Sequence, residues 1–167
     1  VALGLAGVLM QGVTRNPLAD PGLLGVNAGA ALAVVLAIQG AGVGTVFGYV
    51  WFAFVGAAVA ALAVYALGLA GRGGATPVRL ALAGAALTAL LTSVTTAILV
   101  RDVQALDQYR FWVVGSLAGR SGAVAAQVAP FIVVGAVMAM LSGRTLNALA
   151  LGEDTARSLG QRVGWAR

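Results

Sequence analysis

The sequence from Thr45 to Ala70 reads TVFGYVWFAFVGAAVAALAVYALGLA, and this stretch decides the fold. It carries no charged side chain from one end to the other. A helix needs about 20 apolar residues to cross the roughly 30 Å of hydrocarbon in a bilayer, so the stretch predicts a membrane-spanning helix.

The composition of the whole chain agrees with that interpretation. Of the 167 residues, 60% are hydrophobic and 9% are charged, and the mean hydropathy is +0.98. Soluble domains carry roughly 25% charged residues, so we expect a membrane protein. All basic residues are arginines, and neither histidine nor cysteine is present. This excludes disulfides, thiolate chemistry, His-based acid–base catalysis and His or Cys metal sites.

Four further apolar runs flank the stretch, which gives five predicted spanning segments. The five runs cover residues 1–13, 23–43, 45–70, 78–100 and 123–141. The first is too short to span and contains the start of the chain, so we expect a fragment of a longer protein. Residues 101–122 are mixed in character and interfacial, with Tyr109, Phe111 and Trp112 as anchors at the headgroups. The expected fold is an all-α, polytopic transmembrane helical bundle that forms one domain over residues 1–167.

The arginines predict the orientation in the membrane, because cytoplasmic loops collect basic residues. If the runs cross alternately, one side holds Arg15, Arg72, Arg79, Arg144, Arg157, Arg162 and Arg167. The other side holds Arg101, Arg110 and Arg120. The larger set marks the cytoplasm. The same pattern accounts for the net charge of +5 without nucleic acid, since the arginines are scattered and form no basic stripe.

The first two runs are separated by a polar loop that reads TRNPLADPGLLG, from Thr14 to Gly25. Its prolines forbid a continuous helix, its Asn and Asp side chains can bond to the backbone of a turn or cap, and its glycines permit tight packing. The residues concerned are Asn16, Pro17, Asp20, Pro21 and Gly22. They predict a structured re-entry loop, with a direct role in transport as the alternative.

Small residues recur at four-residue spacing in two places, and this spacing lets membrane helices approach closely. One set is Gly25, Gly29 and Ala33, and the other is Gly40, Gly44 and Gly48. The second set lies near a turn, so a role in a loop is an equal alternative for it.

Polar side chains within the apolar runs are candidates for a pathway. Four threonines of the fourth run share one helical face: Thr88, Thr92, Thr95 and Thr96. They either line a polar pathway or donate back to carbonyl groups one turn earlier. Gln11, near the inner end of the first run, either bonds across helices or faces a cavity. No charged residue lies near the centre of any predicted span and no acidic pair suggests hydrolysis, so we expect no enzyme and an energy source outside this chain.

Charged and apolar residues mix at helical spacing in the long stretch from Leu146 to Arg162. Thr145 can cap a first short helix, Gly152 can end it, and a second short helix can run on to Gly160. Two helices of this length are unstable alone in water. The stretch therefore predicts a docking element for a soluble partner, with a solvated loop as the alternative.

Three separated motifs give the sequence a family resemblance. They are Gln11-Gly12 with Asn16 to Gly25, then Arg79-Leu80-Ala81-Leu82-Ala83-Gly84, then Leu149-Ala150-Leu151-Gly152-Glu153 followed by Ala156-Arg157 and Leu159-Gly160. In this order and at this spacing, the chain resembles the iron-siderophore, haem and vitamin B12 importer permeases of the ABC superfamily. Members of that family have about ten spanning helices and roughly twice this length. The resemblance implies that the chain corresponds to the second through sixth helices and the loop after the sixth.

The resemblance also implies roles for particular residues. A coupling element within residues 142–162 docks on the ATPase subunit, and its matching positions are Leu146, Leu149, Leu151, Gly152, Glu153, Ala156, Arg157, Leu159 and Gly160. The loop near the cytoplasmic gate matches Thr76, Pro77, Val78 and Arg79. Here Pro77 and Val78 stand where the family often has small hydroxyl residues. Extracellular arginines pair with a substrate-binding protein in this family, and the candidates by location are Arg101, Arg110 and Arg120.

The implied function is that of a permease subunit in the bacterial inner (plasma) membrane. The subunit pairs with a second permease copy or paralogue, and separate ATP-binding subunits drive import of a ferric siderophore, or of haem or cobalamin. An extracytoplasmic substrate-binding protein delivers the substrate, and no cofactor, metal or nucleic acid is expected. The chain itself has no GxxxxGK[ST] nucleotide loop. The alternatives are a secondary carrier or channel without an ATPase, and an inactive, truncated membrane protein.

Overall fold

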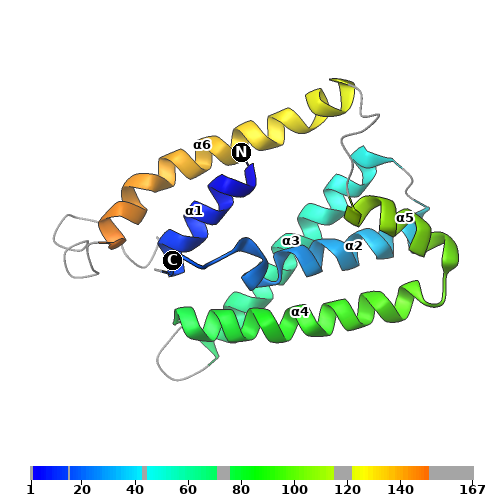
Figure 1. The fold of residues 1–167 in the computed structure, drawn as a ribbon, viewed down its shortest axis with the longest axis horizontal. Helices are drawn as coiled ribbons and strands as arrows, with labels where there is room; N and C mark the ends of the chain where they lie inside the picture. The colour runs from blue at the N-terminus through cyan, green and yellow to red at the C-terminus, as the bar shows by residue number, and fades with distance from the viewer. Residues whose placement is uncertain (1, 15, 43–44, 71–75, 115–121, 151–167) are drawn as a thin grey trace. The chain divides into compact units, whose positions relative to one another are not determined.

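The computed structural model describes residues 2–14, 16–42, 45–70, 76–114 and 122–150, and no strand occurs among them (Figure 1). The helices are α1 (Ala2–Thr14), α2 (Val26–Ala41), α3 (Val46–Leu69), α4 (Pro77–Leu99), α5 (Val103–Val114) and α6 (Gly122–Ala150), with a 3-10 turn, η1, at Pro21–Leu24. The all-α prediction is confirmed.

Three of the described helices are long and apolar enough to cross a membrane. They are Phe47–Leu69 of α3, Pro77–Leu99 of α4 and Gly122–Gly143 of α6, of 23, 23 and 22 residues, with mean hydropathy of 2.2, 1.8 and 2.2. α1 and α2 are apolar but shorter, with 13 and 16 residues. The five predicted apolar segments are thus all helical, and three of them reach spanning length within the described residues.

α2 is shorter than the apolar run that predicts it, because the backbone turns at both ends. The 3-10 turn comes first, and Gly25 follows it in the left-handed region at φ 68°. At the other end Gly42 is left-handed as well, at φ 60°, and its N–H donates to the Ala37 carbonyl. Glycine adopts this conformation without a Cβ clash, so the two glycines set the length of α2.

α3 and α4 begin close to where the sequence predicts, because a threonine caps each of them. The Thr45 hydroxyl accepts a hydrogen bond from the Gly48 N–H at 3.3 Å, and the Thr76 hydroxyl accepts one from the Arg79 N–H at 3.4 Å. Pro77 follows at the start of α4, where its missing N–H would have had no partner inside the helix.

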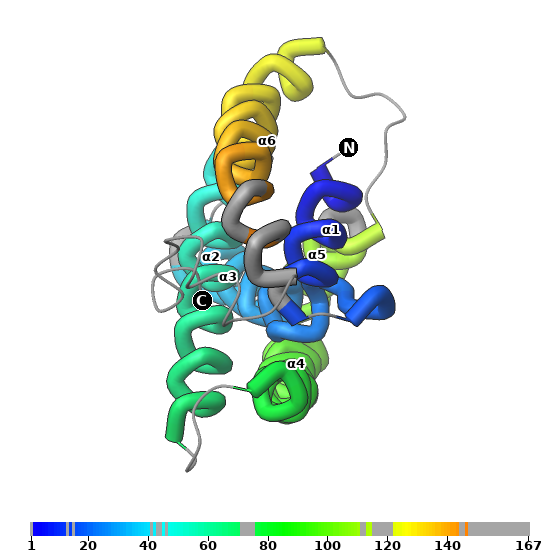
Figure 2. Tube along the Cα trace, turned by 90° about the vertical axis from the view of Figure 1, so that its left-hand side faces the viewer, coloured from blue at the N-terminus to red at the C-terminus, as the bar shows by residue number. Residues whose placement is uncertain are grey.

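Contacts within the chain define two compact units, residues 1–21 with 121–167 and residues 22–120. In the first unit α1 lies beside α6, as both Figure 1 and Figure 2 show. Leu146 of α6 faces Gly12 of α1, where an added methyl carbon would lie 3.5 Å from the Leu146 Cδ1 atom. The single domain over residues 1–167 stays a prediction.

In the second unit, α2 packs against α3, α4 and α5 (Figure 1). One core cluster joins three of these helices through Val34, Val35 and Ile38 of α2, Leu99 of α4 and Ala105 of α5. The cluster lies near the end of α4, so α5 is held against the same end of the bundle.

The sequence marks residues 101–122 as mixed and interfacial without predicting a helix, and the structure forms α5 within them. Asp102 caps it by accepting a hydrogen bond from the Ala105 N–H at 3.0 Å. The Tyr49 hydroxyl of α3 donates to Gln108 Oε1 at 3.3 Å, which ties α5 to a second helix. Partial burial raises the pKa of the Tyr109 phenol on the same helix above its usual value.

α6 departs from the sequence-based expectation at its C-terminal end. It runs without a break from Gly122 to Ala150, although the sequence predicts a span that ends near Leu141 and a new helix after Thr145. The prediction of a separate helix start at Thr145 is wrong, because a lone glycine and a threonine only weaken a helix and do not end it. Residues 151–160, with the predicted bend at Gly152, lie outside the described part of the chain.

Candidate functional site

Gly29 and Ala33 of the first small-residue set mark the face of α2 that packs against α3, whereas Gly25 lies against α4. A Cβ added to Gly29 would collide with the Gly56 carbonyl oxygen and with the Ala60 methyl group. Conversely, a Cβ on Gly56 would collide with the Gly29 carbonyl oxygen and the Ala33 methyl group. The two backbones are therefore in direct contact, as expected for a small-residue helix crossing.

The sequence analysis identifies the α2 residues of this crossing but not the α3 residues. Gly56 and Ala60 have the same four-residue spacing as Gly29 and Ala33, and that spacing is the signal that could have found them. The second predicted set behaves differently, because a Cβ on Gly40 would meet no atom within 4 Å. Gly40 therefore makes no close helix contact within the described residues, and Gly44 lies outside them.

A second close approach joins the turn before α2 to α4. The carbonyl oxygen of Leu23 occupies the space in which a Cβ of Gly84 would stand. One helical turn further along α4, Thr88 Oγ1 lies 3.4 Å from the position of a Cβ on Gly25. We call Leu23, Gly25, Gly84 and Thr88 the turn–α4 junction.

Two of the four hydroxyl groups of the predicted threonine face bond back within α4. The Thr95 hydroxyl donates to the Leu91 carbonyl at 2.8 Å, and the Thr96 hydroxyl donates to the Thr92 carbonyl at 2.9 Å. Ser93 does the same toward the Ala89 carbonyl at 2.8 Å. For these hydroxyls the structure has the helix-internal bonds that the sequence offers as the alternative to a pathway.

Thr88 differs from the other hydroxyl residues of α4. Its Oγ1 is buried and has no hydrogen-bond partner among the described residues. Thr92 and Thr96 are exposed, whereas Thr95 is only 4% exposed. The four threonines therefore do not form one uniform face: two are open on the surface of α4, one is packed in the core, and Thr88 lies at the turn–α4 junction.

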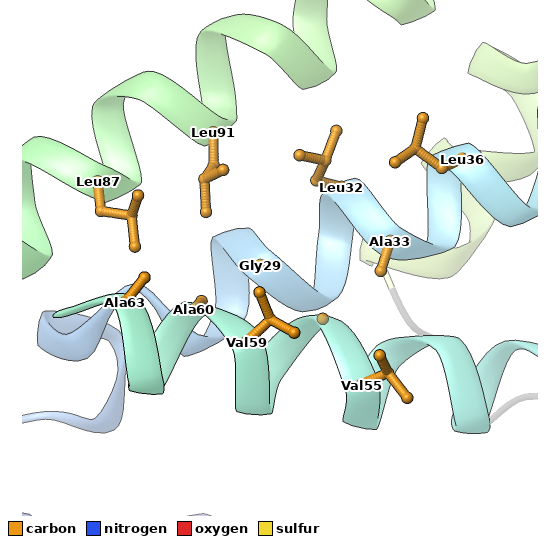
Figure 3. A pocket seen from close by; sticks show the side chains of 11 residues that line it. Gly29, Leu32, Ala33, Leu36, Val55, Val59, Ala60, Ala63, Leu87 and Leu91 are labelled. Atoms are coloured by element: carbon orange, nitrogen blue, oxygen red, sulfur yellow. The ribbon is translucent and has the colours of Figure 1, made fainter. Parts of the chain in front are cut away.

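A cavity of about 280 Å³ lies where α2, α3 and α4 meet (Figure 3). Leu32 and Leu36 of α2, Val55 and Val59 of α3, and Leu87 and Leu91 of α4 form its walls. The helix crossing at Gly29 and Gly56 contributes to the lining. Apolar walls offer no hydrogen bonds or charges, so this cavity is unsuited to a polar metal chelate.

The four predicted gate residues form the start of α4. Thr76 is its cap and Pro77 is its first residue, while Val78 is 68% exposed. Arg79 is half-buried and takes part in an interaction within the chain. The loop before them, residues 71–75, lies outside the described residues, so the gate role stays a prediction.

The residues of the predicted re-entry loop form the expected turn. Asn16 Oδ1 accepts a hydrogen bond from the Leu18 N–H at 3.0 Å, and the Asn16 carbonyl accepts one from the Ala19 N–H at 3.0 Å. Pro17 lies inside this turn, and Pro21 begins η1 with Gly22. Asp20 is exposed and has a partner within the chain. Asn16 thus bonds to the backbone of the turn, and the choice between a structural role and a role in transport stays a prediction.

Other predicted site residues are exposed or lie outside the described residues. Gln11 is exposed on α1, and its carbonyl accepts a hydrogen bond from the Asn16 N–H at 3.3 Å. Arg101 is exposed, and Arg110 pairs loosely with Asp107 at 4.0 Å. Arg120 lies outside the described residues. The three arginines stay candidates for protein docking by location.

Only part of the predicted coupling element is described. Leu146 and Leu149 belong to the last turns of α6, and the Leu146 side chain is half-buried. The remaining predicted coupling residues lie outside the described residues: Leu151, Gly152, Glu153, Ala156, Arg157, Leu159 and Gly160. Within the described residues, no group of three or more acidic, His or Cys side chains could hold a metal ion.

Comparison with known proteins gives consistent matches along the whole chain. A profile described as the FecCD transport family matches residues 1–167. The ferric enterobactin transport system permease protein of Escherichia coli (strain K12) is 50% identical over 163 residues, which are 97% of this chain and 48% of that protein. A probable siderophore transport system permease protein of Bacillus subtilis (strain 168) is 41% identical over 98% of this chain and 49% of its own length.

A solved structure matches the fold as well. It is titled as an inward-facing conformation of a putative metal-chelate type ABC transporter, and it aligns with a TM-score of 0.78 at 26% identity. The alignment covers 98% of this chain and 52% of that one. The chain therefore spans about half the length of the relatives that it matches.

Proposed function

We propose that this chain, which belongs to the FecCD transport family, is part of the transmembrane permease subunit of an ATP-driven importer. The observation that carries the proposal is the family match over residues 1–167, together with 50% identity to a permease named for ferric enterobactin transport. The cargo class that follows is a ferric siderophore, with haem or cobalamin as the related alternative.

The described helices are suited to this role. α3, α4 and α6 are each long enough to cross the hydrocarbon core, and no Asp, Glu, Lys or Arg lies near the centre of these spans. A carrier driven by protons or ions usually keeps such a group inside the membrane. The helices therefore fit a transporter whose energy comes from a separate ATPase subunit.

Transport would proceed by alternating access. ATP binding closes the pair of ATPase subunits, and the coupling element at residues 142–162 passes the movement to the spans. α2 and α3 would move as one body, because their backbones are in contact at Gly29 and Gly56. Such rigid-body movement opens the pathway first to one side of the membrane and then to the other.

The partners in this proposal are an ATP-binding subunit, a second permease copy or paralogue, and an extracytoplasmic substrate-binding protein. Arg101, Arg110 and Arg120 are the proposed contacts to acidic side chains of the binding protein. The proposed location is the bacterial inner membrane, which the chain crosses several times.

Co-purification and uptake together test the proposal. The full-length protein should retain an ATPase subunit in detergent, and its substrate uptake in vesicles should stop when ATP hydrolysis is blocked. A permease that never retains an ATPase and still takes up substrate without hydrolysis would be a secondary carrier or channel, and the proposal would fail.

The coupling element has a test of its own. Gly152→Pro combined with Glu153→Arg should abolish ATPase association, because it alters the predicted bend and reverses a charge at the proposed contact, while membrane insertion is unchanged. Asp107→Arg is the control, since Asp107 is exposed and lies on the opposite side of the membrane by arginine count. Association that survives the double substitution would assign the contact to another part of the protein.

A further inference from the structure

The turn–α4 junction contains a buried hydroxyl group that the fold does not use. Thr88 Oγ1 has no partner among the described residues, whereas Ser93, Thr95 and Thr96 donate to carbonyl groups one turn earlier on the same helix. A buried polar group without a partner is unfavourable, and in a membrane protein water does not readily replace the missing bond. The unpaired Thr88 hydroxyl therefore carries a free-energy cost that the described fold does not offset.

The N-terminal end of α2, which faces Thr88, lacks a side-chain cap. Gly25 is its N-cap residue, and having no side chain it offers no oxygen to the first turn. The Gly25 N–H donates to the Gly22 carbonyl at 3.0 Å, and the Gly25 carbonyl accepts from the Gly29 N–H at 2.9 Å. Helix geometry leaves the N–H groups between these two bonds, those of residues 26–28, without acceptors inside α2.

The uncapped first turn of α2 and the unpartnered Thr88 hydroxyl thus lie at the same junction. Thr88 Oγ1 is 3.4 Å from the position of a Cβ on Gly25, immediately beside the start of α2. The contact of the Leu23 carbonyl with Gly84 lies four residues earlier on α4, about 6 Å away along the axis. A small rotation of α4 about that backbone contact would move the hydroxyl relative to the first turn of α2.

We propose that Thr88 is a latch between α4 and α2. In the conformation described here its hydroxyl oxygen is unpaired, and in a second conformation of the transport cycle it accepts a hydrogen bond from an N–H in the first turn of α2. The latch rests on the proposed function, since it needs a transporter that alternates between two conformations. It assigns Thr88 to the control of that alternation and removes it from the set of residues that line the pathway.

The test uses the full-length protein with its partner subunits, reconstituted in vesicles. Thr88→Val keeps the shape of the side chain and removes the hydroxyl, and Thr88→Ser keeps the hydroxyl. Ser93→Ala is the matched control, because it removes an α4 hydroxyl that already bonds within the helix. Nitroxide labels on Asn27→Cys of α2 and Leu82→Cys of α4, both exposed positions, report the separation of the two helices.

Thr88→Val should slow uptake about fivefold, the factor that corresponds to one ordinary hydrogen bond. It should also shift the distance distribution toward the helix separation of the present structure, both without nucleotide and with a trapped ATP analogue. Thr88→Ser and Ser93→Ala should match the unchanged protein in both measurements.

Three results would overturn the latch: Thr88→Val indistinguishable from the unchanged protein, Thr88→Val and Thr88→Ser impaired equally, or slow uptake with an unchanged distance distribution. The last result would return Thr88 to the pathway. The label distances need no transported substrate, so they test the latch separately. If the protein without substitutions shows no ATP-dependent uptake, the proposed function is refuted instead.

Discussion

Gly84 is a position at which a single methyl group should change the stability of the fold. An alanine there gains up to about 1 kcal/mol of helix propensity. The new Cβ would meet the Leu23 carbonyl, which is backbone and cannot rotate away, and overpacking of this kind costs about 1–3 kcal/mol. We therefore expect Gly84→Ala to lower the Tm of the detergent-solubilised, full-length protein.

Gly135→Ala in α6 is the control for Gly84→Ala, because a Cβ there meets no atom within 4 Å. The propensity gain is then unopposed, so its Tm should stay unchanged or rise. Equal decreases in both variants would mean that the close approach at Gly84 is not what limits stability.

Thr92 and Thr96 are the predicted pathway residues whose side chains are exposed on α4. If their surfaces face the translocation pathway, Thr92→Leu and Thr96→Leu should slow uptake severalfold without lowering abundance in the membrane. Leucine is compatible with the helix, so folding should be preserved. Ser93→Leu, an exposed change at a neighbouring position, should leave uptake near normal. Normal uptake in the two threonine variants would make these hydroxyls purely structural.

At the scale of the elements, the crossing of α2 and α3 depends on two glycines whose backbones touch. Gly29→Ala and Gly56→Ala each insert a methyl group against a carbonyl oxygen of the other helix. We expect each variant to lower stability by about 1–3 kcal/mol and to increase the separation of α2 and α3, measured between spin labels on the two helices.

The same crossing predicts how the two changes combine. Once the first methyl group has separated the helices, the second has more room, so the double variant should lose less stability than the sum of the single variants. Gly40→Ala, an open position on α2, should have no such effect. Additive losses would place the two glycines in independent contacts.

The elements themselves could largely be predicted, and their contacts only in part. A charge-free run with a threonine cap fixes α3, and a Thr-Pro start fixes α4, since both signals are local. The sequence does not predict that α6 extends past Thr145, because a lone glycine and a threonine weaken a helix without ending it. The role of Gly84 and the unpaired state of Thr88 depend on a partner some sixty residues away in the chain, for which periodicity carries no signal.

At the scale of the molecule, the described helices keep large apolar side chains on the outside. Leu62, Leu82 and Leu141 are 68%, 66% and 74% exposed, on three different helices. Large apolar side chains with this much exposure are unsuited to water and are typical of contact with lipid or with other membrane helices. This agrees with the membrane location that composition predicts.

The arginine pattern predicts the orientation of these helices, and thiol labelling can measure it. The sequence contains no cysteine, so a single cysteine in this part of the protein gives a clear signal. Val78→Cys, in the first turn of α4, should react with a membrane-impermeant thiol reagent only from the cytoplasm. Val114→Cys, at the end of α5, should react with it only from outside. Both positions are exposed, at 68% and 81%. Reaction of both from the same side would contradict the alternating arrangement.

The unbroken length of α6 has a mechanical consequence. Its 29 residues extend about 44 Å, roughly 14 Å more than the hydrocarbon thickness of a bilayer. A continuous helix is stiff along its axis, so under the proposed function a displacement of the end near Ala150 would be carried into the spanning part of α6 with little loss. Pro130 lacks an N–H and interrupts the hydrogen-bond ladder, which makes it the compliant point of the rod. Under the proposed function, the displacement of α6 would then be largest between Pro130 and Ala150.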